Sequence, residues 1–380
     1  MSSTQRPTLP TRALHAIVRA GGPGLGVAHR LERLRAAGLR RGIGGLRGTW
    51  AEAAALKRND AATYRRIWTD AARALGAEVE ELGAGFLAIR RAGVETVVQR
   101  NLTMLDTAAS IALALDKSVM HRLLEANGIP VAEQIEGHRG DLTTVADRLA
   151  ASGGLWVVKP ASDSGGGYGV TCGVDTADDL YRAWLWASVW NDRIALERQV
   201  SGIEFRLLFL DGEFVDAVRR DLPSVIGDGR STVAELIAQE NARRIDAGAA
   251  EVSRIIKVDL DCELALRREG LRLRAVVADG RRVVVKSNAG DNGAADNATE
   301  HDLSPAVIKA AAHATRLARL RMSGVDLVTP DPSTSLDEAG GAILEVNANP
   351  GLQHHYLVRD PQNATKVAEV VLDRLLAGSS

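Results

Sequence analysis

Carboxylate and amide side chains interrupt two short apolar runs near the C-terminal end of the chain. Glu345 and Asn347 alternate with apolar neighbours, so at the period of a strand both point to the same face. Upstream, Asp326 interrupts the buried strand predicted over residues 324–328. A carboxylate in an apolar strand is costly unless it is paired or bound to a cation. Two carboxylates and an amide oxygen on adjacent strands suit Mg²⁺ when phosphates complete its coordination, which predicts the metal end of a nucleotide site.

A glycine-rich segment nearer the N-terminus is the candidate binding site for the phosphates of the same nucleotide. The apolar strand predicted over residues 155–158 runs into Lys159 and then into the glycine-rich stretch 162–170. Successive glycines let backbone N–H groups wrap anionic oxygens with no Cβ in the way, and Lys159 adds a positive charge. A plain hairpin would explain the glycines alone, but the downstream acids favour the nucleotide interpretation. The candidate phosphate-binding residues of the loop are Ser164, Gly165, Gly166 and Gly167.

The next predicted strand ends in the run 197–200, and Glu204 follows it. The backbone of Glu197, Arg198 and Val200 at such a strand edge can meet the rim of an adenine. The carboxylate of Glu204 can accept hydrogen bonds from both ribose hydroxyls. A surface strand with ordinary salt bridges is the simpler interpretation when these residues are considered alone. No G-x-x-x-x-G-K-[ST] motif occurs, which argues against a P-loop site.

The elements that must position these residues mix helices and strands in irregular order. Because no strict βαβ repeat occurs, we expect an α+β fold with two lobes rather than one doubly wound sheet. Trp184, Trp186 and Trp190 on one helix are interpreted as core or lobe-packing residues. The predicted helices cover residues 61–75, 117–127, 176–190, 232–240, 305–319 and 363–376. The predicted strands outside the site cover residues 85–89, 94–99, 194–197, 205–210, 214–219 and 283–285.

Length and composition indicate the size of the fold and the compartment of the chain. With 380 residues and a formal net charge of −1, it can form two or three domains. No apolar run approaches the ~20 residues of a membrane span, and no secretory pattern is seen, so we expect a soluble, cytoplasmic protein without a membrane partner. The two cysteines, Cys172 and Cys262, lie far apart, which favours a reducing compartment and argues against a disulfide scaffold or zinc site.

Charge is uneven along the chain. Residues 1–50 contain nine arginines against one acid, Glu32. One interpretation is a solvated basic arm followed by a basic helix. The other is a docking surface for an acidic substrate, a partner or nucleic acid, of which nucleic acid is the least favoured. Residues 1–60 are expected to form this basic segment and residues 61–115 a small α/β segment.

These segments, in this order, resemble the ATP-grasp superfamily, in particular the ATP-grasp portion of cyanophycin synthetase and of bifunctional glutathione synthetase. The resemblance covers roughly residues 116–360. The Gly-Asp-Gly-x-Ser-Thr segment at 227–232, followed by the Ala-Glu-Leu-Ile of a predicted helix, is typical of that subgroup. The other matching segments are 116–117, 157–160, the glycine loop, 196–198, 201–206, 288–293, Asp326 and 345–347.

The resemblance implies that two α+β lobes clasp ATP, a central lobe over 116–200 and a C-terminal lobe over 201–380. It implies that Lys117 and Lys159 contact the α- and β-phosphates, and that Lys286 contacts the γ-phosphate. Only seven of the 47 basic residues are lysines, so the presence of three of them at these positions supports the resemblance. The glycine loop would act as a lid, and the loop from Asn288 would cover the reacting centre. Two Mg²⁺ ions, for which Mn²⁺ can substitute, would bind to Asp326, Glu345 and Asn347.

Two departures from the family limit what the resemblance implies. D-alanine–D-alanine ligases carry an arginine two residues before the metal aspartate, where Gly324 stands here. Residues 1–115 match no partner domain of the larger synthetases, and no Mur-ligase-like second half follows. We therefore expect neither D-alanine ligation nor cyanophycin polymerisation.

The leading hypothesis is an ATP-dependent carboxylate–amine ligase that forms an amide or peptide bond through an acylphosphate, on amino-acid-like or peptide substrates. Strand alternation makes Arg219 and Arg220 face opposite ways, and we favour Arg220 for the reacting centre. The full set of candidate catalytic residues is Lys286, Arg220 and Asn347. The candidate substrate residues are Arg206, Asn288, Gly351 and His355.

Two other hypotheses stay open. The first is a phosphotransferase that forms an acylphosphate or phosphoester without ligation. The second is a nucleotide-binding pseudoenzyme or scaffold that works through the basic N-terminal segment. The intact set of metal-ligating residues argues against the second. A homodimer is expected from the resemblance.

Overall fold

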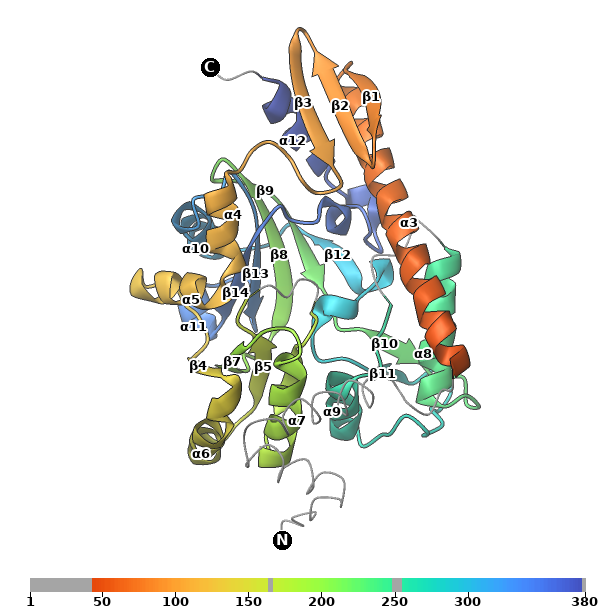
Figure 1. Ribbon diagram of the computed structural model, residues 1–380, viewed down its shortest axis with the longest axis vertical. Helices are drawn as coiled ribbons and strands as arrows, with labels where there is room; N and C mark the ends of the chain where they lie inside the picture. Colours follow the sequence, from red (N-terminus) through yellow and green to blue (C-terminus); the bar gives the residue numbers. More distant parts are fainter. Residues whose placement is uncertain (1–42, 163–166, 248–254, 378–380) are drawn as a thin grey trace.

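The computed structural model describes residues 43–162, 167–247 and 255–377 of the chain (Figure 1). Within these ranges the strands form four sheets, of three, four, five and two strands. Helices cover the sheets without a strict βαβ repeat, which confirms the predicted α+β class. No described helix combines the length and the apolar character that a membrane span requires.

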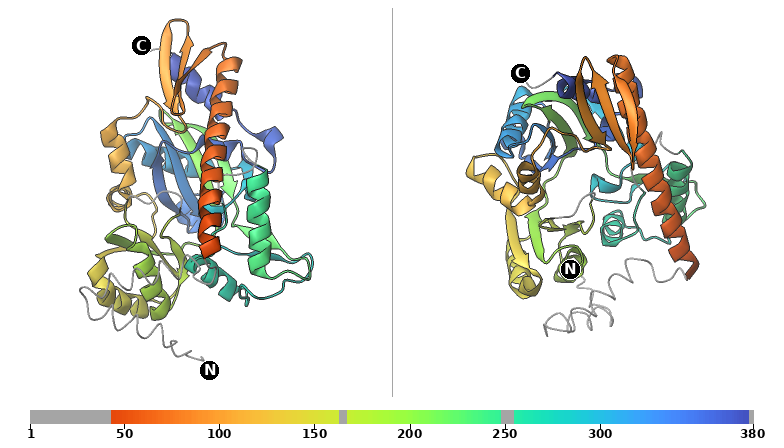
Figure 2. Two further views of the ribbon diagram at one scale, coloured as in Figure 1. Left: turned by 45° about the vertical axis from the view of Figure 1, so that its right-hand side comes forward. Right: turned by 45° about the horizontal axis from the view of Figure 1, so that its top comes forward.

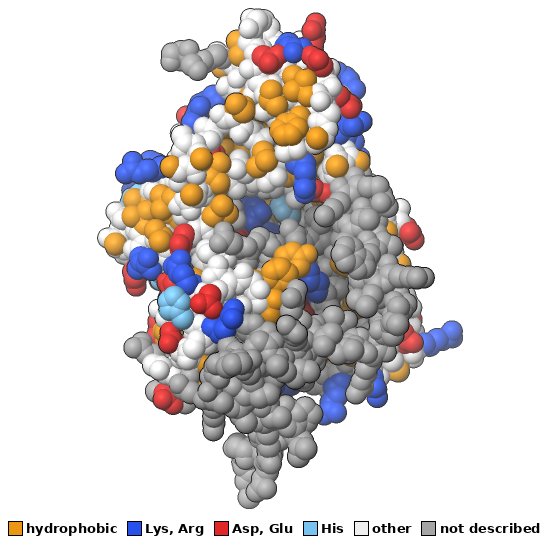
Figure 3. Space-filling model, viewed as in Figure 1, with side chains coloured by type: hydrophobic (Ala, Val, Ile, Leu, Met, Phe, Trp, Pro, Cys, Tyr) orange, Lys and Arg blue, Asp and Glu red, His pale blue; other side chains and the backbone are white. Residues whose placement is uncertain are grey.

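The long helix α3 and the sheet β1-β2-β3 make up what we call the N-terminal unit. Tyr64 and Trp68 on α3 are buried against Leu87 and Ile89 of the sheet, and α12 packs on the same core. Helix α3 extends from the sheet along the molecule toward α8 (Figure 2). Hydrophobic side chains gather on the visible surface of this region (Figure 3). The bounds are α3 (Ile43–Ala74), β1 (Glu78–Gly83), β2 (Phe86–Arg91), β3 (Val94–Gln99) and α12 (Val367–Leu376).

The N-terminal unit differs from the sequence prediction at two points. Helix α3 begins at Ile43 rather than at residue 61. The glycines between 44 and 48 have low helix propensity, so the sequence pattern placed the start too late. Strand β1 was not predicted, because its residues are mostly exposed and carry no alternating apolar pattern.

The four-stranded sheet has the order β4-β7-β5-β6 and corresponds to the predicted central lobe. Trp184 on α7 is fully buried in its core, as predicted. The same prediction is wrong for Trp190, which is 41% exposed and stacks on Tyr168 with ring centroids 4.8 Å apart. The bounds are β4 (Gln134–His138), α6 (Leu142–Ser152), β5 (Trp156–Pro160), β6 (Thr171–Val174), α7 (Ala177–Ala187) and β7 (Arg193–Arg198).

The five-stranded antiparallel sheet has the order β12-β9-β8-β13-β14. Helices α4, α5 and α10 pack on it, and its core contains Phe205, Leu207 and Val325. The predicted hairpin around Asp211 and Gly212 is confirmed, with φ of +50° and +81° at these two residues. The bounds are α4 (Ala108–Leu115), α5 (Lys117–Ala126), β8 (Ile203–Leu210), β9 (Glu213–Arg220), β12 (Asn297–Glu300), α10 (Pro305–Leu317), β13 (Met322–Thr329), α11 (Leu336–Ala339) and β14 (Ala342–Ala348).

A smaller layer flanks these two sheets. The strand pair β10–β11 packs with α8 and α9 around Val233, Ile237 and Val283. Thr232 begins α8 with a capping box, in which its side chain accepts from the Glu235 backbone and Glu235 binds the Thr232 backbone. The bounds are β10 (Ser224–Ile226), α8 (Val233–Asp246), α9 (Leu260–Arg268) and β11 (Arg282–Val284).

Candidate active site

A cavity of about 780 Å³ is lined by residues of both larger sheets. Lys159 on β5 lines it from the four-stranded sheet. Asp326 on β13 and Glu345 on β14 line it from the five-stranded sheet. Lys117 at the start of α5 and the loop 287–290 also line it. The two ends of the predicted nucleotide site therefore open into one cavity.

Strand register brings the acids together. Asp326 is the Cα partner of Glu345 across β13 and β14, and Gly324 is the partner of Asn347. On the other side of β13, Asp326 is the partner of Arg206 on β8. Directly opposite residues on one face of a sheet have Cβ atoms roughly 4.5–5.5 Å apart. Arg206, Asp326 and Glu345 thus form a row across three neighbouring strands.

Basic side chains hold the two acids of this row. Arg206 donates from Nε to Asp326 Oδ1 at 2.6 Å and from Nη2 to Oδ2, so the ion pair is bidentate. Arg206 and Asp326 are 8% and 4% exposed, so water does little to weaken their attraction. Lys117 donates from Nζ to Glu345 Oε2.

Two further cations of the cavity are paired in the same way. Arg220 donates to Glu204 Oε1, and its Nη1 lies 3.7 Å from Asp326 Oδ2. Lys159 Nζ lies 2.6 Å from Glu197 Oε1, and both side chains are more than 90% buried. In this state the charges of the cavity neutralise one another. A ligand that carries both phosphates and metal ions could exchange with these pairs without leaving a buried charge unpaired.

The same network shifts the pKa values of the acids in opposite directions. Burial alone would raise the pKa of Glu345, but Lys117, Lys159 and Arg206 outweigh burial and hold the pKa far below its usual value. Burial raises the pKa of Glu204, and the negative charge of Asp326 adds to this effect, although Arg220 opposes it. Glu345 is therefore the more firmly ionised of the two carboxylates.

Lys286 lies outside the cavity wall. It is 1% exposed, and its Nζ lies 2.6 Å from Asp259 and 3.6 Å from both Asp261 and Asp291. Burial alone would lower the pKa of Lys286, but the three acids outweigh it and raise the pKa. In this conformation the ammonium anchors the loop 287–290 and does not face the cavity.

The chain can be compared with protein-family models, with curated proteins and with solved structures. No family model matches the chain. Cyanophycin synthetase from Trichormus variabilis is 32% identical over 288 residues, which cover 73% of this chain and 31% of that relative. The glutathione biosynthesis bifunctional protein GshAB from Clostridium perfringens is 26% identical over 285 residues, which cover 74% of this chain and 36% of that relative. The crystal structure of a bifunctional glutathione synthetase from Pasteurella multocida gives a TM-score of 0.50 at 23% identity and covers 80% of this chain and 41% of that one. The chain belongs to the ATP-grasp superfamily.

This ATP-grasp chain spans about a third of the length of the curated relatives it matches. The expected fold, with two α+β lobes and an atypical N-terminal segment, is confirmed.

Most of the sequence-predicted site residues of the ATP-grasp chain lie together. The predicted nucleotide residues that line the cavity are Lys117, Lys159, Gly167, Glu197, Arg198, Val200 and Glu204. The predicted metal, catalytic and substrate residues that line it are Asp326, Glu345, Asn347, Arg220, Arg206 and Asn288. Ser164, Gly165 and Gly166 lie outside the described residues. The contact of each residue with nucleotide stays a prediction.

Two predicted substrate residues, Gly351 and His355, do not line the cavity. His355 is fully buried, with Nδ1 2.6 Å from Asp216 Oδ2. Its neighbour His354 lines the cavity instead. Neighbouring side chains point apart, but the sequence pattern did not show which histidine faces inward.

The sequence analysis also missed several residues of the site. Cys172, Gln199, Asp221 and His354 line the cavity without belonging to a motif. Asp259 and Asp261, which hold Lys286, are the N-cap and a first-turn residue of α9, and no motif in the sequence marked them as partners of a lysine.

The donor set fits a divalent metal that shares its coordination with phosphates. Asp326 and Glu345 offer carboxylate oxygens from opposite positions of two strands. Asn347 offers an amide whose Nδ2 lies 3.3 Å from Asp326 Oδ2. No group of three or more His, Cys, Asp or Glu that could hold a metal occurs in the described ranges. These residues therefore suit Mg²⁺ completed by phosphate and water rather than a cage made by protein alone.

Gly324 lies too close to its neighbours to accept a side chain. A Cβ on Gly324 would meet Pro350 Cβ at 2.8 Å and Arg206 Cδ at 3.7 Å. An arginine in this position, as in D-alanine–D-alanine ligases, would displace the turn after β14. The departure noted in the sequence is thus enforced by packing.

We predict that Gly324→Ala lowers the free energy of unfolding by about 1–3 kcal/mol, because the new methyl group overpacks the turn at Pro350. Urea unfolding followed by circular dichroism measures the change. Gly140→Ala is the matched control, because no atom lies within 4 Å of a Cβ at that position. Equal stability of the two variants would contradict the packing argument.

Proposed function

We propose that this ATP-grasp chain is an ATP-dependent carboxylate–amine ligase that acts on amino-acid-like or peptide substrates. One observation carries the proposal. The cavity holds two lysines, Lys117 and Lys159, and two acids, Asp326 and Glu345, and each of these charges is paired with an opposite charge of the cavity wall. Magnesium-loaded ATP offers phosphates for the lysines and metal ions for the acids, so both kinds of charge gain a partner at once.

The nucleotide would lie along the wall of the cavity that the four-stranded sheet supplies. Lys117 and Lys159 would bind the phosphates, with the glycine loop as a lid. The backbone of the run 197–200 would hold adenine, and Glu204 the ribose. Lys286 would reach the γ-phosphate only after it leaves its three acids, so its role requires the loop 287–290 to move.

Asp326, Glu345 and Asn347 would hold two Mg²⁺ ions, and Mn²⁺ would substitute for them. When bound, the ions would neutralise phosphate charge and hold the phosphate oxygens in place. Arg206 and Arg220 already contact Asp326 or lie near it, so they would remain close to the transferred phosphoryl group. A guanidinium beside that group stabilises the negative charge that develops during transfer.

The reaction would take place in two steps. An oxygen of the substrate carboxylate attacks the γ-phosphorus, the bond to the β-phosphate oxygen breaks, and ADP leaves. The amine then attacks the acyl carbon of the acylphosphate, phosphate leaves, and the nitrogen loses a proton. The chain's own contribution is to position the two substrates, neutralise charge with Arg206 and Arg220, and keep water from the acylphosphate.

A substrate panel tests the proposal. The full chain is mixed with Mg-ATP and amino acids or short peptides in pairs, and ADP, phosphate and new masses are measured. We expect one ADP and one phosphate per new amide, whose mass equals that of the two substrates less one water. ADP release without a coupled amide for any pair would contradict ligation, and capture by hydroxylamine without a preference for any amine would favour the phosphotransferase.

The proposal includes a homodimer as the working form. Light scattering on the full chain measures its mass in solution. A mass twice that of the 40.4 kDa chain supports the dimer, and a mass equal to that of one chain would contradict it.

A further inference from the structure

The N-terminal unit packs against the turn that leaves the metal strand β14. Helix α3 packs on η5 (Leu352–His355), the short helix that follows the turn. Asn101, just after β3, donates from Nδ2 to the backbone oxygen of Asn349 at 2.5 Å. Asn349 has a φ of +46°, a conformation in which a non-glycine residue needs support. The unit that the sequence left without a role thus supports the end of the strand that carries Glu345 and Asn347.

A side-chain relay leads from this unit into the active-site cavity. The hydroxyl of Tyr64 on α3 donates to Oε1 of Gln353. Nε2 of Gln353 lies 3.4 Å from Nε2 of His354, and His354 lines the cavity. Tyr64 and the adjacent residues Gln353 and His354, which come from two segments far apart in sequence, therefore connect the core of the N-terminal unit with the cavity wall.

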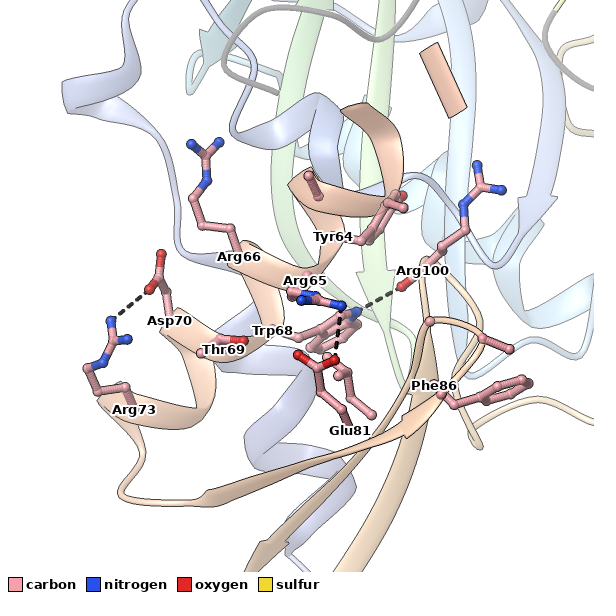
Figure 4. A pocket seen from close by; sticks show the side chains of 16 residues that line it. Tyr64, Arg65, Arg66, Trp68, Thr69, Asp70, Arg73, Glu81, Phe86 and Arg100 are labelled. Atoms are coloured by element: carbon pink, nitrogen blue, oxygen red, sulfur yellow. Dashed lines mark hydrogen bonds and ion pairs between the residues drawn. The ribbon is translucent and has the colours of Figure 1, made fainter. Parts of the chain in front are cut away.

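The start of the relay is held firmly. Tyr64 is 3% exposed and lies on the wall of a second, open hollow of about 740 Å³ (Figure 4). Next to it, Trp68 donates from Nε1 to the backbone oxygen of Arg100 at 2.8 Å (Figure 4). Burial and nearby Asp60 raise the pKa of Tyr64 far above its usual value, so the hydroxyl keeps its proton and remains a donor.

The side chains of Gln353 and His354 occupy space that is open only because residue 351 is glycine. A Cβ on Gly351 would meet Oε1 of Gln353 at 2.6 Å and Cδ2 of His354 at 3.0 Å. Gly351 has an ordinary φ of −70°, so the need for glycine here comes from the side chains packed against it. Gly351, predicted to contact substrate, instead gives room to the two side chains that shape the cavity.

The direction of the hydrogen bonds follows from this arrangement. Because Oε1 of Gln353 accepts from Tyr64, the amide turns its N–H₂ group toward His354. A nitrogen that receives this donor must be the unprotonated nitrogen of a neutral imidazole, so Nδ1 of His354 carries the proton.

We propose that Tyr64 positions His354 through Gln353, so that the N-terminal helix sets the tautomer of an imidazole in the wall of the cavity. Tyr64 and Gln353 are positioning residues, and His354 is the cavity-wall residue that they orient. The proposal rests on the proposed function in taking the cavity as a substrate site. It gives the N-terminal unit a function in the active site. Tyr64 lies far from β13 and β14 in the sequence, but Gln353 connects it to the cavity wall.

Nitrogen NMR of histidine tests the relay in the full chain. The chain has eight histidines, so each imidazole labelled with ¹⁵N can be resolved, and His354→Gln assigns the signal of interest. At a pH where the ring is neutral, the ¹⁵N shifts distinguish the Nδ1–H tautomer from the Nε2–H tautomer. We expect His354 to be in the Nδ1–H form and Tyr64→Phe to shift its population toward the Nε2–H form. The Nε2–H form in the unmodified chain, or an unchanged signal in Tyr64→Phe, would overturn the proposal.

Controls separate the relay from a general loosening of the fold. Tyr181→Phe removes the hydroxyl of another buried tyrosine, in the core of the central lobe, and should leave the His354 signal unchanged. His355 contacts Asp216 instead of Gln353, so its signal should not respond to Tyr64→Phe. A change of His354 in Tyr181→Phe, or of both histidines in Tyr64→Phe, would contradict a specific relay.

A second variant tests the middle of the relay. Gln353→Met removes the amide, so it should shift the His354 tautomer as Tyr64→Phe does. Adding Tyr64→Phe to Gln353→Met should then cause no further shift. Additive shifts would show that Tyr64 acts by another route and would overturn the proposal.

Titration with Mg-ADP keeps the two proposals apart. We expect the unmodified chain and Tyr64→Phe to bind Mg-ADP equally, because no relay residue is among the predicted adenine and phosphate contacts. If Tyr64→Phe alone lost Mg-ADP binding, the effect of Tyr64 would extend beyond His354, and the proposed relay would be wrong. Absence of binding in both would contradict the proposed function, while the tautomer measurement would still decide the relay.

Discussion

Replacing Glu345 by alanine should reduce ADP formation by roughly 1,000-fold or more, because a metal ligand contributes several kcal/mol of charge stabilisation in the transition state. The substitution also leaves Lys117 without its carboxylate partner in a buried position. Phosphate release measured with Mg-ATP and the active substrate pair gives the rate. The loss should appear in kcat, since the metal acts on the transferred phosphoryl group.

Two further variants control the result. Glu345→Gln keeps the size of the side chain and removes its charge, so it should also lose activity. Glu213→Ala removes an exposed acid from β9 of the same sheet and should keep full activity. If Glu345→Ala turned over at the rate of the unmodified chain, the assignment of β14 as a metal strand would be wrong.

Arg206→Leu should lower the free energy of unfolding by about 3–5 kcal/mol, because it leaves Asp326 charged and buried without its bidentate partner. Arg220 lies 3.7 Å from Asp326, too far to replace both lost hydrogen bonds. Urea unfolding without metal measures the loss. Millimolar Mg²⁺ or Mn²⁺ should restore part of it in Arg206→Leu, because a cation can take the place of the guanidinium at Asp326.

Arg219→Leu is the matched control. Arg219 is the neighbour of Arg220 on β9, and its partly exposed pair with Asp221 at 2.8 Å should contribute less than about 1 kcal/mol. The metal should stabilise Arg219→Leu no more than the unmodified chain. If Arg206→Leu were as stable as Arg219→Leu, or gained nothing from metal, the buried ion pair would not hold the acids as described.

The grouping of the candidate metal ligands could be predicted from the sequence, because alternation along a strand depends only on neighbouring residues. Alternation along a strand places Glu345 and Asn347 on one face, and the register of β13 and β14 confirms that Asp326 lies opposite Glu345. The same rule separated Arg219 from Arg220, and Arg220 is the one that lines the cavity. The rule does not apply to His354 and His355, which lie on the short helix η5, and the sequence analysis chose His355 although His354 lines the cavity.

The partners of the charged residues could not be predicted in this way. Arg206 meets Asp326 across 120 positions of sequence, and Lys117 meets Glu345 across 228. Lys286 fits the expected position in the chain, yet three acids hold it away from the cavity. Such pairs follow from the packing of whole elements, which short-range periodicity does not describe.

The N-terminal unit was the largest gap in the prediction. Its role depends on contacts such as Tyr64 with Gln353, which join positions 289 residues apart. No motif marks either residue, and both would be taken for ordinary helix or turn residues in the sequence. Only the folded arrangement shows that the helix meets the turn after β14.

Calorimetric titration of the full chain with ADP, with and without Mg²⁺, tests the central claim most directly. The account predicts one ADP per chain and binding at least tenfold tighter with Mg²⁺, a difference of about 1.4 kcal/mol. The reason is that phosphate alone takes Lys117 from Glu345 and Lys159 from Glu197, so two carboxylates lose their cation, and Mg²⁺ replaces the one lost at Glu345. A folded chain that bound no ADP in the presence of Mg²⁺, or bound it equally well without the metal, would contradict the account.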